Sequence, residues 1–143
     1  MLTKPRLSID VPADATWLKS IRGFLTPILQ RRFEDDEVQA LVLAIDEACA
    51  NIIKHGQSWM RPRGRILLDV IDKKKLIEFR ILNFCGEKDI PKIKPRDLDD
   101  VKPGGLGTHF INEIMDSTEF EPDPKVEGRM QLVMSKSIGG KKP

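Results

Sequence analysis

The chain has 143 residues, of which 40% are apolar and 32% charged, and its formal net charge is +2. This size and balance are typical of one domain with one core, and the small net charge gives no support to nucleic acid as a partner. The two cysteines show neither metal-ligand spacing nor a disulfide framework, and neither a signal-peptide core nor an apolar run of about 20 residues is present. We therefore expect a cytoplasmic protein without membrane contact.

The N-terminal part of the chain is predicted to form a strand and two helices. Leu7–Val11 alternates apolar and polar side chains, which is the pattern of a half-buried strand. Asp14 or Thr16 is placed to cap a helix whose apolar positions recur every three or four residues to about Gln30. After a polar break, a second apolar stripe predicts a helix from Val38 to His55.

The middle of the chain is predicted to form a hairpin. Gly56 is expected to end the preceding helix. Two apolar runs, Arg65–Val70 and Leu76–Leu82, predict strands, and the polar segment Asp72–Lys75 between them predicts a tight turn. The lysines of this turn are expected to be solvated.

The C-terminal part begins with a long loop. Cys85–Gly105 contains three prolines and few large apolar residues, and such loops in small domains are usually functional or disordered. Leu106–Met115 predicts a short helix that starts directly at a glycine cluster. Thr118–Phe120 and Met130–Met134 predict two closing strands, and Gly139–Pro143 predicts a flexible tail.

This order of elements indicates the fold class. Helices grouped apart from a mixed, mostly antiparallel sheet imply an α+β protein, a two-layer sandwich with the helices on one face of the sheet. We find no internal repeat and expect a single domain over residues 1–138.

Three polar side chains recur at four-residue intervals on the second predicted helix. Glu47, Asn51 and His55 therefore project along one helix face. Burying such groups unpaired costs about 1–3 kcal/mol each, and a metal with phosphates would satisfy them. The carbonyl oxygen of Asn51 suits Mg²⁺, and Glu47 is placed to accept a proton from an attacking hydroxyl. Alternatively, Glu47 is solvated and Asn51 caps a local backbone group.

A glycine cluster precedes the short helix. Gly104, Gly105 and Gly107 let backbone N–H groups point at a phosphate. The helix that begins near Leu106 adds its positive end, and Thr108 adds a hydroxyl donor. A simple turn before a helix is the alternative. The segment lacks the Gly-Lys-Ser/Thr of a Walker A loop and the βαβ context of a dinucleotide fingerprint, but with the polar helix face it predicts a nucleotide site.

These two segments resemble sequence boxes of a known superfamily. Leu43–His55 resembles the N box of the GHKL (Bergerat-fold) ATPases, and Pro103–Ile111 resembles their G2 box. Within that superfamily the chain is most similar to the small anti-sigma-factor serine kinases, over nearly its whole length. The resemblance implies an α/β sandwich that binds Mg·ATP and phosphorylates a serine of an anti-sigma-factor antagonist. It also implies a protein that sequesters a sigma factor, usually as a homodimer.

The resemblance also implies roles for individual residues. Glu47 is expected to be the catalytic base, Asn51 the Mg²⁺ ligand, and Gly104–Thr108 the phosphate-binding end of a lid. His55, on the face of Glu47 and Asn51, is a further nucleotide-binding candidate. Arg96 lies in the loop that would cover the phosphates, where it either pairs with the γ-phosphate on closure or stays solvated.

One position departs from the family pattern. The G1 box has the form Asp-x-Gly, and aligning its Gly on Gly86 places Phe84 where the adenine-binding Asp belongs. Asn83 is the substitute acceptor if the strand end carries a one-residue bulge, and Glu87 and Asp89 are others. Losing one charge-assisted hydrogen bond costs roughly 1.5–3 kcal/mol, which is one or two orders of magnitude in affinity.

Two other functions remain open. Phe84 motivates a catalytically inactive module of the same fold that captures a sigma factor or an antagonist without nucleotide. A sensor-kinase ATPase module acting on histidine is less favoured, because no dimerisation and phosphoacceptor helix precedes the first strand.

Overall fold

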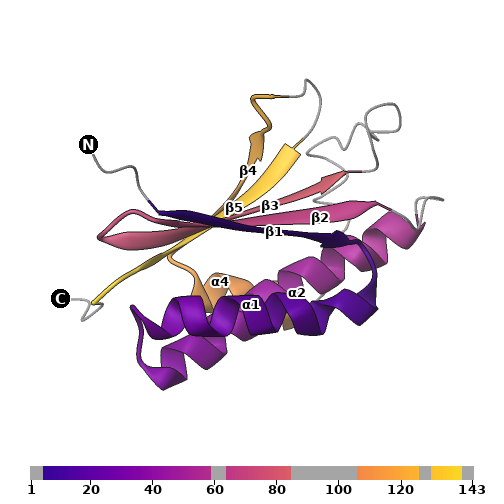
Figure 1. The fold of residues 1–143 in the computed structure, drawn as a ribbon. Helices are drawn as coiled ribbons and strands as arrows, with labels where there is room; N and C mark the ends of the chain where they lie inside the picture. Colours follow the sequence, from indigo (N-terminus) through magenta and orange to yellow (C-terminus); the bar gives the residue numbers. More distant parts are fainter. Residues whose placement is uncertain (1–4, 59–63, 85–105, 126–129, 140–143) are drawn as a thin grey trace.

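The protein is a two-layer sandwich in which helices cover one face of a sheet (Figure 1). The computed structural model describes residues 5–58, 64–84, 106–125 and 130–139. Within these residues, three α-helices lie below a five-stranded sheet, and every strand pairing is antiparallel. The expected α+β class, with helices on one face, is confirmed.

The sheet has the strand order β1-β2-β3-β5-β4. Its strands are β1 (Arg6–Pro12), β2 (Arg65–Asp72), β3 (Leu76–Phe84), β4 (Ser117–Pro122) and β5 (Met130–Ser137). All five predicted strands are present, and each extends slightly beyond its predicted bounds. Because β1 pairs with β2, the N-terminal strand joins the hairpin that follows the two long helices.

The helices begin and end close to their predicted bounds. A 3₁₀ turn, η1 (Ala15–Trp17), leads into α1 (Leu18–Gln30), and α2 (Asp35–Ser58) and α4 (Leu106–Ile114) follow. Asp14 caps the 3₁₀ turn, since its Oδ1 accepts a 3.0 Å hydrogen bond from the Thr16 backbone N–H. Of the helices in the described ranges, none combines the length and the apolar character needed to cross a membrane.

Two predicted bounds of the second helix were wrong. The helix begins at Asp35, before the first apolar position, because Asp35, Asp36 and Glu37 in its first turn complement the positive end of the helix dipole. Gly56 does not end the helix, which continues to Ser58. A glycine costs a helix only about 1 kcal/mol, so propensity is a weak guide to where a helix ends.

Alternation along the strands gives the sheet one apolar face, which packs against the helices. Phe79 and Ile81 of β3 lie opposite Val70 and Leu68 of β2 on this face, and all four are at most 2% exposed. The helical part of the same core includes Ile21, Leu25 and Leu29 of α1, Leu41, Ile45 and Cys49 of α2, and Ile111 of α4. This shared core fixes the helices to the sheet.

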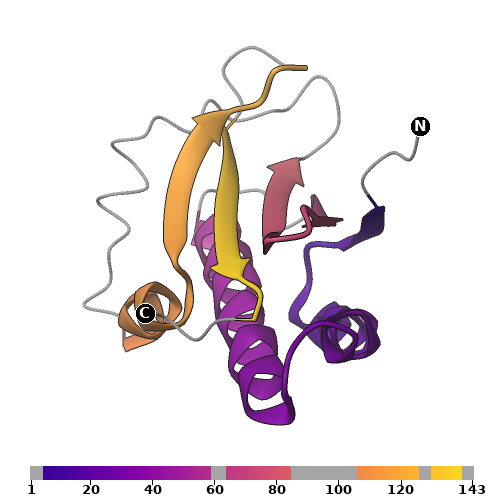
Figure 2. The ribbon, with the colours of Figure 1, turned by 90° about the vertical axis from the view of Figure 1, so that its left-hand side faces the viewer.

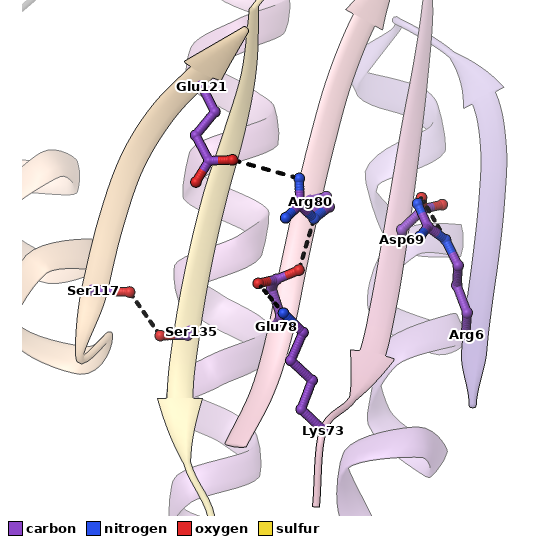
Figure 3. A network of polar contacts seen from close by, with 8 residues as sticks. All are labelled: Arg6, Asp69, Lys73, Glu78, Arg80, Ser117, Glu121 and Ser135. Atoms are coloured by element: carbon purple, nitrogen blue, oxygen red, sulfur yellow. Dashed lines mark hydrogen bonds and ion pairs between the residues drawn. The ribbon is translucent and has the colours of Figure 1, made fainter. Parts of the chain in front are cut away.

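The other face of the sheet carries a network of ion pairs (Figure 3). Lys73 Nζ and Arg80 Nε donate to the two oxygens of Glu78 at 2.8 and 2.7 Å, and Arg80 lies 3.7 Å from Glu121 of β4. Glu78 is only 8% exposed. Burial alone raises the pKa of Glu78, but the hydrogen bonds and charges of Lys73 and Arg80 outweigh burial and hold the pKa below its ordinary value of 4.5.

A second carboxylate on this face joins the two N-terminal strands of the sheet. Asp69 of β2 is 7% exposed and accepts hydrogen bonds from Arg6 and from the Ser8 hydroxyl of β1 (Figure 3). Asp69 takes its donors from the neighbouring strand β1, whereas Glu78 takes them from the β2–β3 turn and from its own strand. Both carboxylates are therefore satisfied, and the contacts of Asp69 fasten β1 to β2.

The β2–β3 turn contains one residue in the left-handed region of the backbone map. Lys74 has φ +71°, its N–H donates to Asp72 Oδ1, and the following N–H, of Lys75, donates to the Lys73 carbonyl oxygen. The predicted tight turn at Asp72–Lys75 is confirmed. A lysine at such a position carries about 1–2 kcal/mol of backbone strain, which a glycine would not.

Substituting adjacent lysines of this turn should change stability in opposite directions. Lys74→Gly should raise the free energy of unfolding by about 0.5 kcal/mol, because the relief of left-handed strain exceeds the entropic cost of glycine. Lys75→Gly removes the same charge but relieves no such strain, and should lower the free energy of unfolding by about 0.5–1 kcal/mol. Urea denaturation measures both, and effects of equal sign would contradict the assignment.

The Glu78 ion pairs should make stability depend on pH in the acid range. Because the pKa of Glu78 is lower in the folded protein than in the unfolded one, the pairs stabilise the fold above about pH 4.5, and this contribution is lost as the pH falls through the folded pKa. Glu78→Gln should lower the free energy of unfolding at neutral pH by about 1–2 kcal/mol and flatten its decline below about pH 5. The exposed Glu119 supplies the control, since Glu119→Gln should keep the wild-type pH profile.

Candidate functional site

Helix α2 occupies the centre of the helical layer, between α1 and α4 (Figure 2). Its buried stripe includes Leu41, Ala44, Ile45, Ala48 and Cys49, none more than 2% exposed. Because this stripe packs against the sheet and against both neighbouring helices, the rotation of α2 about its axis is fixed. The polar residues of α2 therefore have defined directions.

Glu47 and Asn51 lie half-buried on the flank of α2 that turns away from α1. The opposite flank is marked by Asp46, whose Oδ1 accepts a 2.6 Å hydrogen bond from Arg22 Nη1 of α1. At 3.6 residues per turn, Glu47 and Asn51 are rotated about 100° and 140° from Asp46 around the helix. Helix α4 packs on that side of α2, so both side chains lie on the side of α2 where α4 lies (Figure 2).

The C-terminal half of α2 lies near the end of the sheet where β3 terminates. The Arg32 side chain, just after α1, donates to the Lys74 carbonyl oxygen at 2.8 Å, which places the end of α1 at the β2–β3 turn. Helix α2 starts a few residues later at the same end of the sandwich, which we call the turn end because it carries the β2–β3 turn. Its 24 residues extend about 36 Å toward the opposite end, where β3 stops at Phe84. Asn51 is thus in the part of α2 directed to that end.

Helix α4 ends near the β2–β3 turn, and its nine residues extend about 13 Å back from there. After its last turn, the Asp116 N–H donates to the Ser135 carbonyl oxygen, and the Ser137 N–H donates to Asp116 Oδ2. Ser137 lies opposite Leu76, the first residue of β3, so α4 ends at the turn end of the sandwich. Its first residue, Leu106, lies farther from the β2–β3 turn than its last. Glu47 and Asn51 therefore lie on the side of α2 where α4 packs, and Asn51 belongs to the half of α2 that is directed to the end of β3.

Asn83 is the described side chain that β3 contributes to this end of the sandwich. It lies opposite Ile66 on the helix-facing side of the sheet, and its Nδ2 donates a 3.0 Å hydrogen bond to the Arg65 carbonyl oxygen. This bond uses the amide N–H and not the carbonyl oxygen Oδ1. The pairing of β2 with β3 is regular through Phe84, so the one-residue bulge that was the condition for Asn83 to act as acceptor is absent from the described part of β3.

Cys49 is excluded as a reactive group of the site. Its thiol is fully buried on the core side of α2, and burial, with a smaller contribution from the Asp46 charge, raises its pKa to about 12. A thiol with such a pKa is protonated at neutral pH and is a poor nucleophile or metal ligand. Among the described side chains of α2, Glu47 and Asn51 share one flank, and Asp46 is engaged by Arg22 on the other.

Several predicted site residues lie partly or wholly outside the described parts of the chain. Gly86, Arg96, Gly104 and Gly105 belong to residues 85–105, which the structure does not describe. The backbone of α2 includes His55, and the first turn of α4 includes Leu106, Gly107 and Thr108, but the side chains of these four residues are not described. The described side chains of the site are therefore Glu47, Asn51 and Asn83.

Sequence reasoning missed the pair of Arg22 and Asp46, which positions α2 beside the site. The side chain of Asp46 is 17% exposed and that of Arg22 is 42% exposed. One signal was available in the sequence, because Asp46 interrupts the apolar stripe of α2 between Ile45 and Cys49. Its partner on another helix was not readable.

The sequence matches the histidine kinase-like ATPase domain family over residues 11–136, from β1 to β5, and the chain belongs to this family. It is 26% identical, over 129 residues, to serine-protein kinase RsbW of Halalkalibacterium halodurans, covering 84% of this chain and 78% of the relative. It is 27% identical, over 144 aligned positions, to serine-protein kinase RsbW of Bacillus cereus (strain AH820), covering 93% and 85%. The resemblance to the GHKL serine kinases is thereby confirmed.

Removing the charge of Arg22 should loosen α2 beside the site. Arg22→Gln leaves the largely buried Asp46 carboxylate without its cation, and should lower the free energy of unfolding by about 1 kcal/mol. Arg31→Gln removes the same charge from an exposed residue with no ion pair among the described residues, and should change stability by less than about 0.5 kcal/mol. Thermal unfolding of both variants makes the comparison, and equal effects would contradict a role for the pair.

Proposed function

We propose that this protein is a cytoplasmic, ATP-dependent protein-serine kinase and anti-sigma factor of a partner-switching system. It phosphorylates an anti-sigma-factor antagonist and, when unopposed, sequesters a sigma factor, acting as a homodimer. The observation that carries the proposal is that the half-buried Glu47 and Asn51 share one flank of α2, on the side where α4 packs, in a chain of the histidine kinase-like ATPase family. Two relatives named as serine-protein kinases support serine as the acceptor.

The proposed nucleotide site lies between α2 and residues 86–108. Asn51 offers a half-buried carbonyl oxygen, a ligand type that Mg²⁺ accepts beside phosphate and water oxygens, so the residue fits the ion. Gly104–Thr108 and the start of α4 supply backbone N–H groups to the phosphates, with Arg96 as a further phosphate contact. His55 and Gly86 complete the set of nucleotide-binding candidates. Bound Mg²⁺ neutralises charge on the β- and γ-phosphates of ATP.

Glu47 is the proposed general base. It accepts the proton of the partner's serine hydroxyl while the serine oxygen bonds to the γ-phosphorus and the bond to the bridging oxygen of the ADP leaving group breaks. Its half-buried position on the flank beside Asn51 suits this role, because the residue is next to the proposed phosphate site and still reaches a partner at the surface. The ion pair of Asp46 with Arg22 keeps the neighbouring carboxylate engaged on the other flank.

Asn83 is the proposed acceptor for the adenine amino group. It replaces the aspartate of the family pattern without any bulge, because strand alternation already places it on the helix-facing side of the sheet, opposite Ile66. Its Nδ2 bond to the Arg65 carbonyl oxygen orients the amide and leaves Oδ1 to accept. A neutral amide accepts a weaker hydrogen bond than a carboxylate, so the proposal includes a reduced affinity for adenine.

The test combines ATP titration with a transfer assay on the Glu47→Gln variant. Wild-type protein should bind ATP in a Mg²⁺-dependent manner by calorimetry, and Glu47→Gln should bind with unchanged affinity. Phosphorylation of a purified candidate antagonist should fall by about 10²–10⁴-fold, because only proton acceptance is lost. Phosphate-affinity gels measure the transferred phosphate.

A carboxyl on the same helix provides the control. Glu37 lies in the first turn of α2, about 15 Å along the axis from Glu47, and Glu37→Gln should leave transfer unchanged. An undiminished rate in Glu47→Gln would reject the assigned base. Absence of binding up to millimolar ATP would reject the kinase itself.

Phe84 favours one alternative function. If the pocket has lost adenine recognition at this position, the protein is a partner-binding module that captures a sigma factor or an antagonist without nucleotide. In that case ATP and ADP do not change the affinity for the partner. If the protein is a kinase, bound nucleotide should change the affinity for the partner. Measuring partner affinity with and without Mg·ATP separates the two.

A further inference from the structure

A small hollow opens at the turn end of the sandwich, far from Glu47 and Asn51. It has a volume of about 60 Å³ and lies between the end of α1 and the first three strands. Its floor is Val70 and Ile77, each 2% exposed, and its walls include Pro5, Leu7 and Ile28. Leu7 is 43% exposed although it belongs to the helix-facing side of β1. The hollow is therefore apolar inside and open to the surface.

The rim of the hollow is positively charged. Arg31, Arg32 and Asp72 line it, but Asp72 is already neutralised, because its Oδ2 lies 3.3 Å from Arg32 Nη1. Arg32 also donates to the Lys74 carbonyl oxygen at 2.8 Å, which brings the β2–β3 turn to the same edge. Arg31, Lys74 and Lys75 are exposed and make no ion pair with any other described residue. These cations leave the rim with excess positive charge.

The β2–β3 turn also carries backbone strain at this edge. Lys74 has φ +71°, a conformation that glycine adopts without cost. Strained residues cluster at functional sites, where the surrounding structure maintains them. The strained backbone of Lys74 is hydrogen-bonded to Arg32, whose side chain lines the hollow.

The size and lining of the hollow restrict what it accepts. Sites for whole small molecules have about 300–1,000 Å³, so this hollow accommodates one side chain rather than a ligand of that size. Phosphate or nucleic acid would use the cations but not the apolar floor, and the flat surface of a membrane would not reach Val70 and Ile77. An aliphatic side chain flanked by carboxylates would contact the apolar floor and would also place negative charge beside the cations of the rim.

We propose that this surface, defined by the apolar hollow and its rim of Arg31, Arg32, Lys74 and Lys75, docks an acidic segment of a partner protein through one aliphatic side chain. The aliphatic group contacts Val70, Ile77 and Ile28, and neighbouring carboxylates face the unpaired cations of the rim. Roughly 30 Å, the length of β3, separates this surface from the Asn83 end, so the two are occupied independently. The inference does not depend on the proposed kinase activity.

The test uses a synthetic acidic peptide, with a leucine between aspartates and glutamates, added to ¹⁵N-labelled protein. Amide shifts should change at residues 28–32 and 70–77 and not at 47–51. Arg31→Glu should weaken binding about tenfold, and Lys74→Gly, which relieves strain and so keeps the fold, about threefold. Lys19→Glu is the matched control, since Lys19 is an exposed cation at the other end of α1 and its reversal should leave peptide affinity unchanged.

Other results would overturn the proposal. Equal binding of a peptide with serine in place of leucine would show attraction by charge alone, without docking in the hollow. Equal weakening by Lys19→Glu and Arg31→Glu would show the same. Shifts of these amides by phosphatidylglycerol vesicles or a DNA duplex, but not by the peptide, would assign the surface to a membrane or to nucleic acid. No peptide-induced shifts at millimolar concentration would reject it.

Discussion

The burial of one stripe of α2 is the constraint on which the rest of the structure depends. The helix packs against the sheet on one side and against α1 and α4 on its flanks, so it has a single rotational setting. Asp46 then meets Arg22 of α1, and Glu47 and Asn51 are turned away from α1. A rotation of one residue would exchange a core position for a polar one, at a cost of several kcal/mol. The candidate site is therefore held in place by core packing.

The two faces of the sheet are stabilised by different interactions. The helix-facing side uses apolar burial, with Phe79 and Ile81 at its centre. The other side uses carboxylates held by cations, since Asp69 of β2 binds Arg6 of β1, and Glu78 binds Arg80 of its own strand and Lys73 of the β2–β3 turn. Because ion pairs need specific geometry whereas apolar contacts tolerate sliding, the charged face reinforces the register that the turn begins. A fixed register keeps Asn83 on the correct side of β3.

Much of this architecture was predictable from local pattern. Alternation gave the strands, and four-residue spacing put Glu47 and Asn51 on one flank, because both signals depend on short-range geometry. The end of α2 was mispredicted at Gly56 because a glycine costs a helix only about 1 kcal/mol and so does not fix where the helix ends. The contact of Arg22 with Asp46 joins residues of different helices, and the hydrogen bond from Asn83 to the Arg65 carbonyl oxygen joins two strands. Neither contact is encoded in any short stretch, so both required the folded structure.

The pairing of β1 with β2 has a consequence for how the chain is made. Arg6 faces Ile71 and Pro12 faces Arg65, so β1 has no partner in this sheet until two helices and a further strand have been synthesised. At roughly 5–20 residues per second, the delay is several seconds. During that interval α1 and α2 are available to associate, and β1 carries exposed hydrogen-bonding edges that invite pairing with other nascent chains. Completion of the sheet is thus a late step in biosynthesis.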